Sequence, residues 1–292
     1  MRIVPVSSPT SAGERGLSGE GLRELMNRDY VHGYDERANT RLQDQADAVV
    51  DLVHSDTTYP AGSLVLEAGC GVGAQTVTLA RNSPGARIVS VDIAAASLAA
   101  ARAKVEAAGL TNVRFQQADI YALPFARASF DHVFVCFLLE HLARPLEALA
   151  RLKELLKPGG TITVVEGDHG STYFHPDSEA AYAAIRCQVE LQRAAGGNAN
   201  VGRELYPLLR QAGFSAVRVS PRMVYVDSSR PHLVDGFTRK TFTAMIEGVR
   251  EAALKARMID PERFDAGIRA LYRTAEEDGV FCYTFFKAFG RT

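Results

Sequence analysis

Hydrophobic and polar residues follow patterns that change several times along the chain. Residues 37–54 carry apolar side chains at every third or fourth position, which predicts a helix. Short runs rich in β-branched and aromatic residues then predict strands at 63–68, 87–92, 112–117, 132–137 and 161–166. Helical spacing lies between most of these runs, at 74–82, 95–108 and 145–156. Strands that alternate with helices predict a parallel sheet covered by helices on both faces.

The second half of the chain has longer helical stretches and fewer strands. Its expected elements are helices at 177–195, 201–212 and about 231–277, and strands near 216–226 and at 280–289. At the other end, residues 1–18 are rich in Ser, Gly and Pro, which favours a flexible arm.

Charge and composition narrow the range of functions. The 292 residues include 33 Lys and Arg against 34 Asp and Glu, without the basic stripe that nucleic-acid binders usually show. We therefore expect no nucleic-acid partner. The 4 cysteines are scattered and form no CxxC pair, which favours reduced thiols in a cytoplasmic protein. No apolar run approaches the roughly 20 residues that cross a membrane, so we expect no membrane association.

One motif carries most of the chemical information. The stretch VLEAGCGVGAQT (65–76) places Gly69, Gly71 and Gly73 directly behind a short apolar run. Where a strand ends in a glycine-rich turn and a helix follows, backbone N–H groups point at a bound anion or nucleotide, and absent Cβ atoms let it approach. Gly69, Gly71 and Ala74 also fit the G-x-G-x-x-G/A pattern of nicotinamide dinucleotide sites.

A carboxylate follows at the distance that a nucleotide site requires. Asp92 ends the next expected strand, 19 residues after Gly73, where it could accept hydrogen bonds from ribose hydroxyls. NAD and S-adenosylmethionine both carry such a ribose, so the loop and Asp92 leave both cofactors open. The alternative for Asp92 is a purely structural role, since an aspartate there can cap the helix at 95–108.

Further residues favour S-adenosylmethionine. Glu67 precedes the glycines, where an acid would repel a pyrophosphate but could help to hold a cationic amino acid group. Asp119, in QADIYALPF (117–125), follows the third expected strand and could accept a hydrogen bond from the adenine amino group. Its alternative role is again capping. LKPGG (156–160) predicts a tight turn before the fifth strand.

With these motifs in this order, the chain resembles the class I S-adenosylmethionine-dependent methyltransferases, especially the branch that includes the ubiquinone and menaquinone biosynthesis enzymes. The matching stretches are VLEAGCGVG (65–73), VDI (91–93), ADI (118–120), FDHVFVCFLLEHL (130–142) and LKPGG (156–160). The resemblance implies an α/β fold with a Rossmann-like, doubly wound sheet of seven strands in the order 3-2-1-4-5-7-6, the last strand antiparallel. It also implies S-adenosylmethionine as the cofactor, and methyl transfer to an O, N or C nucleophile of a small molecule.

The resemblance also implies roles for the remaining segments of the chain. Residues 1–18 would form the flexible arm, and helices within 19–58 would cover the site. The methyltransferase domain would fill 59–292, with helical lid insertions at about 171–200 and 229–278. We expect a monomer or a homodimer.

The residues expected at the cofactor come from the matched motifs. They are Glu67, Gly69, Cys70, Gly71, Gly73, Asp92, Ile93, Asp119, Ile120, Cys136 and His141. The residues expected at the substrate or in the lid are Tyr30, Tyr34, His175 and Arg239. His169, after the fifth strand, is the candidate general base, and its neighbour Asp168 could orient the ring or raise its basicity. The alternative is an ordinary loop histidine. We expect no metal, because Asp168, His169 and His175 match no metal-binding spacing.

Two other functions stay open at this point. An NAD-dependent oxidoreductase would use the same loop and Asp92. A non-catalytic partner subunit that binds S-adenosylmethionine would keep the motifs without turnover.

Overall fold

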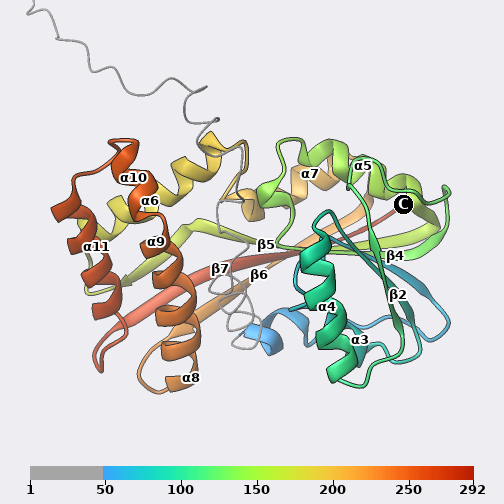
Figure 1. The fold of residues 1–292 in the computed structure, drawn as a ribbon, viewed down its shortest axis with the longest axis horizontal. Coiled ribbons are helices and arrows are strands. Elements are labelled where there is room, and N and C mark those ends of the chain that lie inside the picture. Colours follow the sequence, from blue (N-terminus) through green and yellow to red (C-terminus); the bar gives the residue numbers. More distant parts are fainter. Residues whose placement is uncertain (1–48) are drawn as a thin grey trace, which may run out of the picture.

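A mixed sheet forms the centre of the computed structural model, which describes residues 49–292 (Figure 1). The sheet has seven strands in the order β3-β2-β1-β4-β5-β7-β6, and β7 runs antiparallel to both of its neighbours. The strands are β1 (Leu64–Ala68), β2 (Arg87–Asp92), β3 (Val113–Gln117), β4 (Phe130–Cys136), β5 (Leu156–His175), β6 (Ser215–Val226) and β7 (Val280–Arg291). The expected fold class and strand order are therefore confirmed.

Helices cover both faces of the parallel half of the sheet (Figure 1). Those on one face are α3 (Thr76–Asn82) and α4 (Ala95–Ala107), and those on the other are α5 (Pro145–Leu155) and α7 (Leu205–Gln211). Successive side chains of a strand point to opposite faces. In β1, Val65 accordingly packs into the apolar cluster on one face and Leu66 into the cluster on the other. Because both faces are buried, β1 appears in the sequence as a continuous apolar run rather than an alternating one.

β5 is much longer than the sequence pattern indicates. The pattern predicts a strand at 161–166, but β5 has 20 residues and continues to His175. It pairs in parallel with β4 as far as Val165, opposite Cys136, and antiparallel with β7 from Thr161 to His175, so β7 is its only strand partner beyond Val165 in the described sheet. The predicted end was wrong because the partner of the distal part lies far along the chain. The expected lid insertion at about 171–200 therefore begins as a strand.

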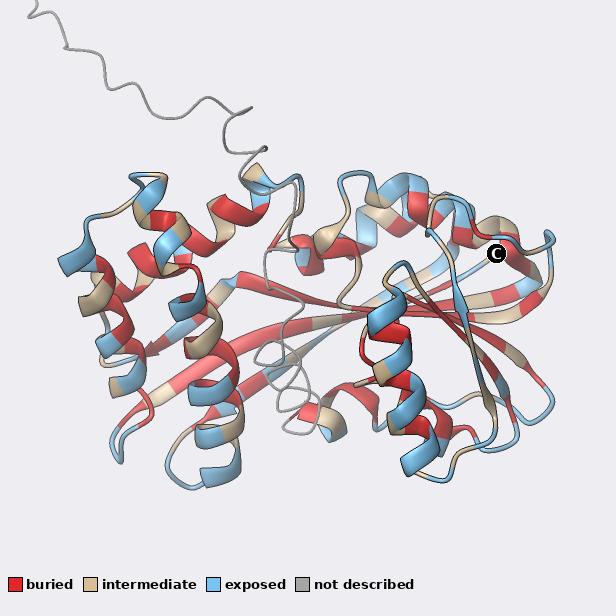
Figure 2. Ribbon diagram, viewed as in Figure 1, coloured by how far each residue is buried: buried red, intermediate tan, exposed pale blue. Residues whose placement is uncertain are grey.

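A group of helices surrounds the distal parts of β5 and β7 at one end of the molecule (Figure 1). These are α6 (Glu179–Ala194), α8 (Pro231–Leu233), the π-helix η3 (Val234–Thr243), α9 (Ala244–Gly248), α10 (Arg250–Lys255) and α11 (Pro261–Arg273). The short 3-10 helices η1 (Leu139–His141) and η2 (Val201–Glu204) follow β4 and α6. We call the six helices around the distal strands the lid. Their buried residues lie mainly on the sides that face the sheet and one another (Figure 2).

Side-chain caps explain where two lid helices begin. The hydroxyl of Ser178 accepts a hydrogen bond from the N–H of Ala181 at the start of α6, and the carboxylate of Asp260 accepts one from Arg263 at the start of α11. The two helices also approach closely. A Cβ on Gly267 would lie 2.4 Å from the carbonyl oxygen of Ala180, so this position requires glycine.

The segment before β1 is fastened to β7. Val53 is buried in the core, in a helical stretch that covers the described residues 49–54. Lys287 donates hydrogen bonds to the carbonyl oxygen of Val53 at 3.0 Å and to the hydroxyl of Thr57 at 2.6 Å, and it pairs with Asp56 at 2.5 Å. Tyr30, Tyr34, the arm at 1–18 and most of 19–58 lie outside the described residues. Within 49–292, no helix combines the length and hydropathy needed to cross a membrane.

Candidate functional site

The three glycines after β1 have left-handed backbones but different surroundings. The φ angles of Gly69, Gly71 and Gly73 are +75°, +50° and +77°. A Cβ on Gly73 would lie 2.8 Å from the Cα of Ala101, so α4 can approach only a glycine there. Within residues 49–292, a Cβ on Gly71 would meet nothing within 4 Å. Packing among these residues therefore does not require a bare backbone at Gly71, and the described part of the chain leaves space beside it for a ligand.

Hydrogen bonds hold this loop against the end of β2. The N–H groups of Gly69 and Cys70 donate to the carbonyl oxygen of Val91 at 2.8 and 3.0 Å. Asp92 accepts from the N–H of Gly71 at 2.8 Å through one carboxylate oxygen, and from the N–H of Ala94, just before α4, at 2.9 Å through the other. The N-cap residue of α4 is Ala94 and no side chain caps this helix, so the bonds of Asp92 hold the loop and the approach to α4 rather than cap the helix. Each oxygen has a second lone pair, so Asp92 can also accept hydrogen bonds from a ligand.

Glu67 lies buried beneath the loop. It accepts hydrogen bonds from the hydroxyls of Thr76 at 2.8 Å and Ser90 at 2.5 Å, and so connects the start of α3 to β2. Burial raises the pKa of Glu67 from its usual 4.5 to about 7, although the two hydrogen bonds act in the opposite direction. A cation bound near the loop would favour the ionised form of this carboxyl.

The other residues expected at the cofactor lie at the ends of neighbouring strands. Ile93 follows Asp92 and leaves 59% of its surface exposed, which is unusual for an isoleucine beside a buried strand end. Asp119, after β3, is exposed and accepts a hydrogen bond from the N–H of Tyr121 at 2.9 Å. Ile120 is half-buried. These side chains give the loop an apolar and acidic border on the β2 and β3 side.

The remaining expected cofactor residues follow β4 or sit in the loop. Cys136 ends β4, and burial raises the pKa of both its thiol and that of Cys70, so neither is a reactive thiolate. His141, in η1, is half-buried and lies 3.6 Å from the carboxylate of Glu140.

His169, the candidate base, contacts residues of the lid, of β7 and of the segment between α6 and η2. Nδ1 of His169 is 3.1 Å from the carbonyl oxygen of Ala199 and 3.2 Å from the hydroxyl of Tyr283, and Nε2 is 3.4 Å from the sulfur of Met245. His169 is only 5% exposed. It is part of β5, not of a loop after it, so its description as a loop histidine is wrong.

Asp168 has a partner of its own. Arg203 of η2 donates to both carboxylate oxygens, at 2.7 and 2.8 Å, and the carboxylate is buried whereas the guanidinium is half-exposed. This bidentate pair joins β5 to η2, next to the irregular stretch between Asp168 and Tyr173. The geometry thus supports a structural function for Asp168.

The two expected lid residues within the described chain lie elsewhere. His175 is exposed at the end of β5. The guanidinium of Arg239 in η3 donates to the carbonyl oxygen of Ala275 at 3.0 Å, which ties η3 to the turn after α11. The structure therefore brings Gly71, Cys70 and Asp92 together at one place, whereas His169 and His175 lie along β5 and Arg239 lies in the lid.

Comparison with known proteins agrees with this geometry. A family model described as a methyltransferase domain matches residues 65–160, which include the glycine loop, Asp92 and Asp119. The O-methyltransferase cnsE of Penicillium expansum is 31% identical over 224 residues, which cover 73% of this chain and 75% of that protein. The demethylmenaquinone methyltransferase of Thermus thermophilus is 34% identical over 162 residues, which cover 56% of this chain and 65% of that enzyme. The chain belongs to the class I S-adenosylmethionine-dependent methyltransferases.

A solved methyltransferase has the same fold. The phosphoethanolamine N-methyltransferase 2 of Haemonchus contortus, in complex with S-adenosylhomocysteine, aligns with a TM-score of 0.55 at 17% identity. The alignment covers 91% of the present chain and 60% of that one. The present chain covers less than two thirds of the length of several curated relatives that it matches.

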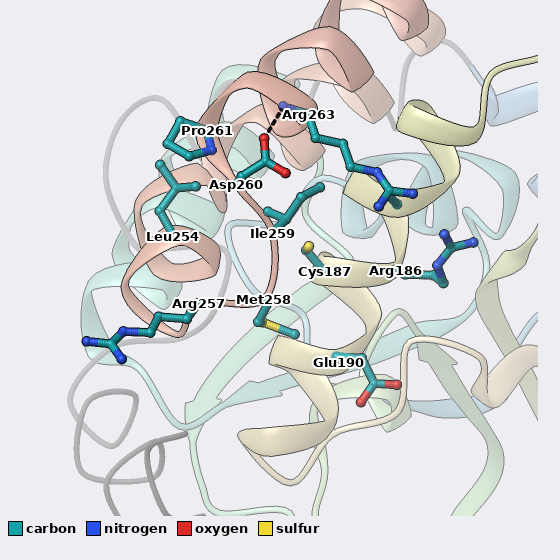
Figure 3. A pocket seen from close by; sticks show the side chains of 11 residues that line it. Arg186, Cys187, Glu190, Leu254, Arg257, Met258, Ile259, Asp260, Pro261 and Arg263 are labelled. Carbon is teal, nitrogen blue, oxygen red and sulfur yellow. Dashed lines mark hydrogen bonds between the residues drawn. The ribbon is translucent and has the colours of Figure 1, made fainter. Parts of the chain in front are cut away.

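A separate pocket of about 820 Å³ opens in the lid of the methyltransferase (Figure 3). Cys187 of α6 faces the segment that carries Met258 and Ile259, with Arg263 above them (Figure 3). Burial raises the pKa of Cys187, although nearby arginines act in the opposite direction. The lining residues come from α6 and 254–263, whereas the glycine loop belongs to the β1–α3 connection, so this pocket is distinct from the expected cofactor site.

Several residues at the site could not be inferred from the sequence. Thr76 and Ser90 hold Glu67, Gln75 is bonded to His54, and Tyr283 contacts His169. Each contact joins residues from separate elements. For one further residue, Glu166 of β5, the sequence did carry a signal, because it is an acid directly behind an apolar run. The structure buries it fully.

Proposed function

We propose that this chain transfers a methyl group from S-adenosylmethionine to an O, N or C nucleophile of a small molecule. The observation that carries the proposal is the open space beside Gly71, whose N–H is held by Asp92, in a chain of the methyltransferase family. The relatives support a small-molecule acceptor, since one is named an O-methyltransferase and another a demethylmenaquinone methyltransferase.

In this proposal, a separate set of residues binds each part of the cofactor. Asp92 accepts hydrogen bonds from the ribose hydroxyls, and Asp119 accepts one from the adenine amino group. Exposed Ile93 and half-buried Ile120 supply apolar contacts to the flat adenine. Gly69 to Gly73 and the buried charge of Glu67 receive the cationic amino acid end, beside Cys70, Cys136 and His141.

Methyl transfer from S-adenosylmethionine requires little covalent chemistry from side chains. The sulfonium of bound S-adenosylmethionine makes its methyl group electrophilic, so the protein must mainly hold the nucleophile in line, at roughly 3–3.5 Å, and exclude water. Met245 of the lid and Tyr283 of β7, both against His169, would supply part of an apolar enclosure for this step. His169 is retained as the proposed base. Asp168 is proposed to hold β5 in place through Arg203 rather than to take part in proton transfer.

The proposal also covers the binding partner, the oligomeric state and the cellular compartment of the protein. The balanced charge of the chain supports a small molecule rather than a nucleic acid as the partner. A monomer or a homodimer is proposed, and light scattering would distinguish them. All four cysteines are free thiols, which supports the reducing cytoplasm as the compartment.

Calorimetry and mass spectrometry test the activity. The chain should bind S-adenosylmethionine and S-adenosylhomocysteine, and NAD should not compete with them. Incubation with a deuterated methyl donor and a metabolite extract should yield labelled product together with S-adenosylhomocysteine. Cofactor binding without any turnover would favour a non-catalytic partner subunit, and absence of cofactor binding would contradict the proposal.

A further inference from the structure

The lid pocket between α6 and residues 254–263 has the size and lining of a small-molecule site (Figure 3). Its volume of about 820 Å³ lies within the range of roughly 300–1,000 Å³ that is usual for ligand pockets. Such pockets combine an apolar lining with a few polar groups. The apolar side chains here are Ala183, Cys187, Leu254, Met258 and Ile259. They offer a surface to the apolar body of a ligand.

Positive charge exceeds negative charge around this pocket. Three arginines and two acids line it, namely Arg186, Arg257, Arg263, Glu190 and Asp260. Both acids already have partners, because Glu190 pairs with Arg193 at 2.5 Å and Asp260 accepts a hydrogen bond from the backbone N–H of Arg263. Among residues 49–292, the guanidinium groups of Arg186 and Arg263 form no ion pair. An anionic ligand would therefore find unused positive charges at the pocket.

Arg186 of α6 and Arg263 of α11 lie on the same side of Cys187. Figure 3 shows both side chains extending to one side of the thiol, whereas Arg257 extends away from them. The charges of Arg186 and Arg263 act to lower the pKa of Cys187, but burial raises it more, so this thiol is neutral near pH 7. α6 and α11 pack closely at Gly267, which fixes the two helices relative to each other. Two guanidinium groups thus lie beside a neutral, apolar lining.

We propose that this pocket binds a small organic acid, with its carboxylate at Arg186 and Arg263 and its apolar body beside Cys187. Guanidinium groups suit this task, because their planar N–H donors match the geometry of a carboxylate and their charge does not titrate near neutral pH. A monoanion fits better than a phosphate monoester, since additional negative charge would be repelled by Glu190 and Asp260 of the same lining.

This organic acid would be a second ligand, separate from the cofactor and the methyl acceptor. The described residues that line the pocket belong to α6 and 254–263, whereas Gly71 and Asp92 belong to the glycine loop and the end of β2. The inference therefore does not depend on the proposed methyl transfer. A ligand that contacts both α6 and residues 254–263 would hold them together and stabilise the folded protein by mass action.

Calorimetry with cinnamate and cinnamamide tests this site. The two probes have the same shape, but only cinnamate carries a carboxylate. The wild type should bind cinnamate about ten-fold more tightly than cinnamamide, because hydrogen bonds to a charged group are stronger than those to a neutral one. Saturation with S-adenosylhomocysteine should change the affinity for cinnamate by no more than a few-fold. Equal binding of the two probes, or displacement of cinnamate by S-adenosylhomocysteine, would overturn the site.

Variants at exposed positions locate the binding without endangering the fold. Arg186→Gln and Arg263→Gln should each weaken cinnamate binding by about ten-fold and leave cinnamamide binding unchanged. Arg269→Gln is the matched control, because Arg269 is also exposed on α11 but does not line the pocket, and it should bind cinnamate like the wild type.

Met258→Glu tests the lining itself. Met258 is 37% exposed, so the fold should tolerate the change, and the new charge should repel cinnamate and weaken its binding by about ten-fold. Wild-type affinity for cinnamate in Met258→Glu or in both pocket arginine variants would overturn the proposal, as would an equal loss in Arg269→Gln.

Discussion

His54 donates a hydrogen bond from Nε2 to the side-chain oxygen of Gln75, with 2.6 Å between the two atoms. Gln75 directly precedes α3, so this bond joins the segment before β1 to the end of the glycine loop. Burial lowers the pKa of His54 from its usual 6.5 to about 4. The ring is therefore neutral near pH 7, with its proton on Nε2.

His54 and Glu67 should have opposite effects on stability as the pH changes. The contribution of His54 is fully present above about pH 6.5 and is lost as the pH falls towards 4, because the unfolded chain takes up the proton first. The contribution of Glu67 is fully present below about pH 4.5 and is lost as the pH rises towards 7, because its folded-state pKa is raised. Each shift corresponds to about 3 kcal/mol of unfolding free energy. In the wild type the two effects should largely cancel between these pH values.

Two variants should reveal the cancelled effects. Glu67→Gln keeps an oxygen for Thr76 and Ser90 but does not titrate, so its unfolding free energy should rise with pH between about 4.5 and 6.5. His54→Asn should show the opposite slope. Urea denaturation at a series of pH values measures both, and parallel curves for the two variants would contradict the assignment.

Gly71→Ala should weaken cofactor binding more than it weakens the fold. Its Cβ would enter the open space beside the loop, where the proposed ligand lies. Gly62→Ala is a matched control, because Gly62 also has a left-handed backbone, φ +83°, with no atom of residues 49–292 within 4 Å of a Cβ. Both variants should lose about 1 kcal/mol of unfolding free energy. Calorimetry should show a large loss of S-adenosylmethionine affinity in Gly71→Ala alone; equal affinities in the two variants would remove Gly71 from the site.

Asp92→Asn should reduce S-adenosylmethionine affinity by about 1.5–3 kcal/mol, the usual contribution of hydrogen bonds to a charged group. The asparagine oxygen can still accept from Gly71 or Ala94, so the loop should remain folded. Calorimetry measures the loss, and circular dichroism verifies the fold. Unchanged affinity would mean that Asp92 only supports the loop and the segment before α4.

Arg203→Ala should destabilise the protein more than Asp168→Ala. Removal of Arg203 leaves a buried carboxylate without its bidentate partner, which should cost about 3 kcal/mol or more. Removal of Asp168 leaves a half-exposed guanidinium that water can solvate, so the loss should be smaller. Urea denaturation compares the two, and the reverse order would contradict a supporting role for this pair.

His169→Gln tests the proposed base. If His169 takes a proton from the acceptor, kcat should fall by about 10²- to 10⁴-fold while cofactor affinity changes little. A normal kcat in the variant would restrict His169 to its contacts with Tyr283 and Met245.

Local patterns were sufficient for the parallel half of the fold. The strand predicted at 87–92 has these bounds in the structure, and the one predicted at 63–68 differs from β1 by a single residue. The spacing between the glycines and Asp92 also predicted their proximity, which the hydrogen bond to Gly71 confirms. These features depend on neighbours within one β-α-β unit.

Features that depend on distant residues could not be predicted. The continuation of β5 to His175 requires pairing with β7, and the contact between Lys287 and Asp56 joins opposite ends of the described chain. The pair of Asp168 and Arg203 likewise depends on how η2 packs against β5. No periodicity in the sequence encodes such contacts, because they arise only after the strands have assembled.

The length of β5 limits how the protein can be re-engineered. The same strand forms part of the cofactor-binding sheet and the floor of the lid, because its first part lies between β4 and β7 and its distal part continues along β7. Exchange of the lid together with the distal part of β5 would therefore cut the ladder of backbone hydrogen bonds between β5 and β7. Grafts confined to the six lid helices, which are α6 and the helices between β6 and β7, would leave this ladder intact.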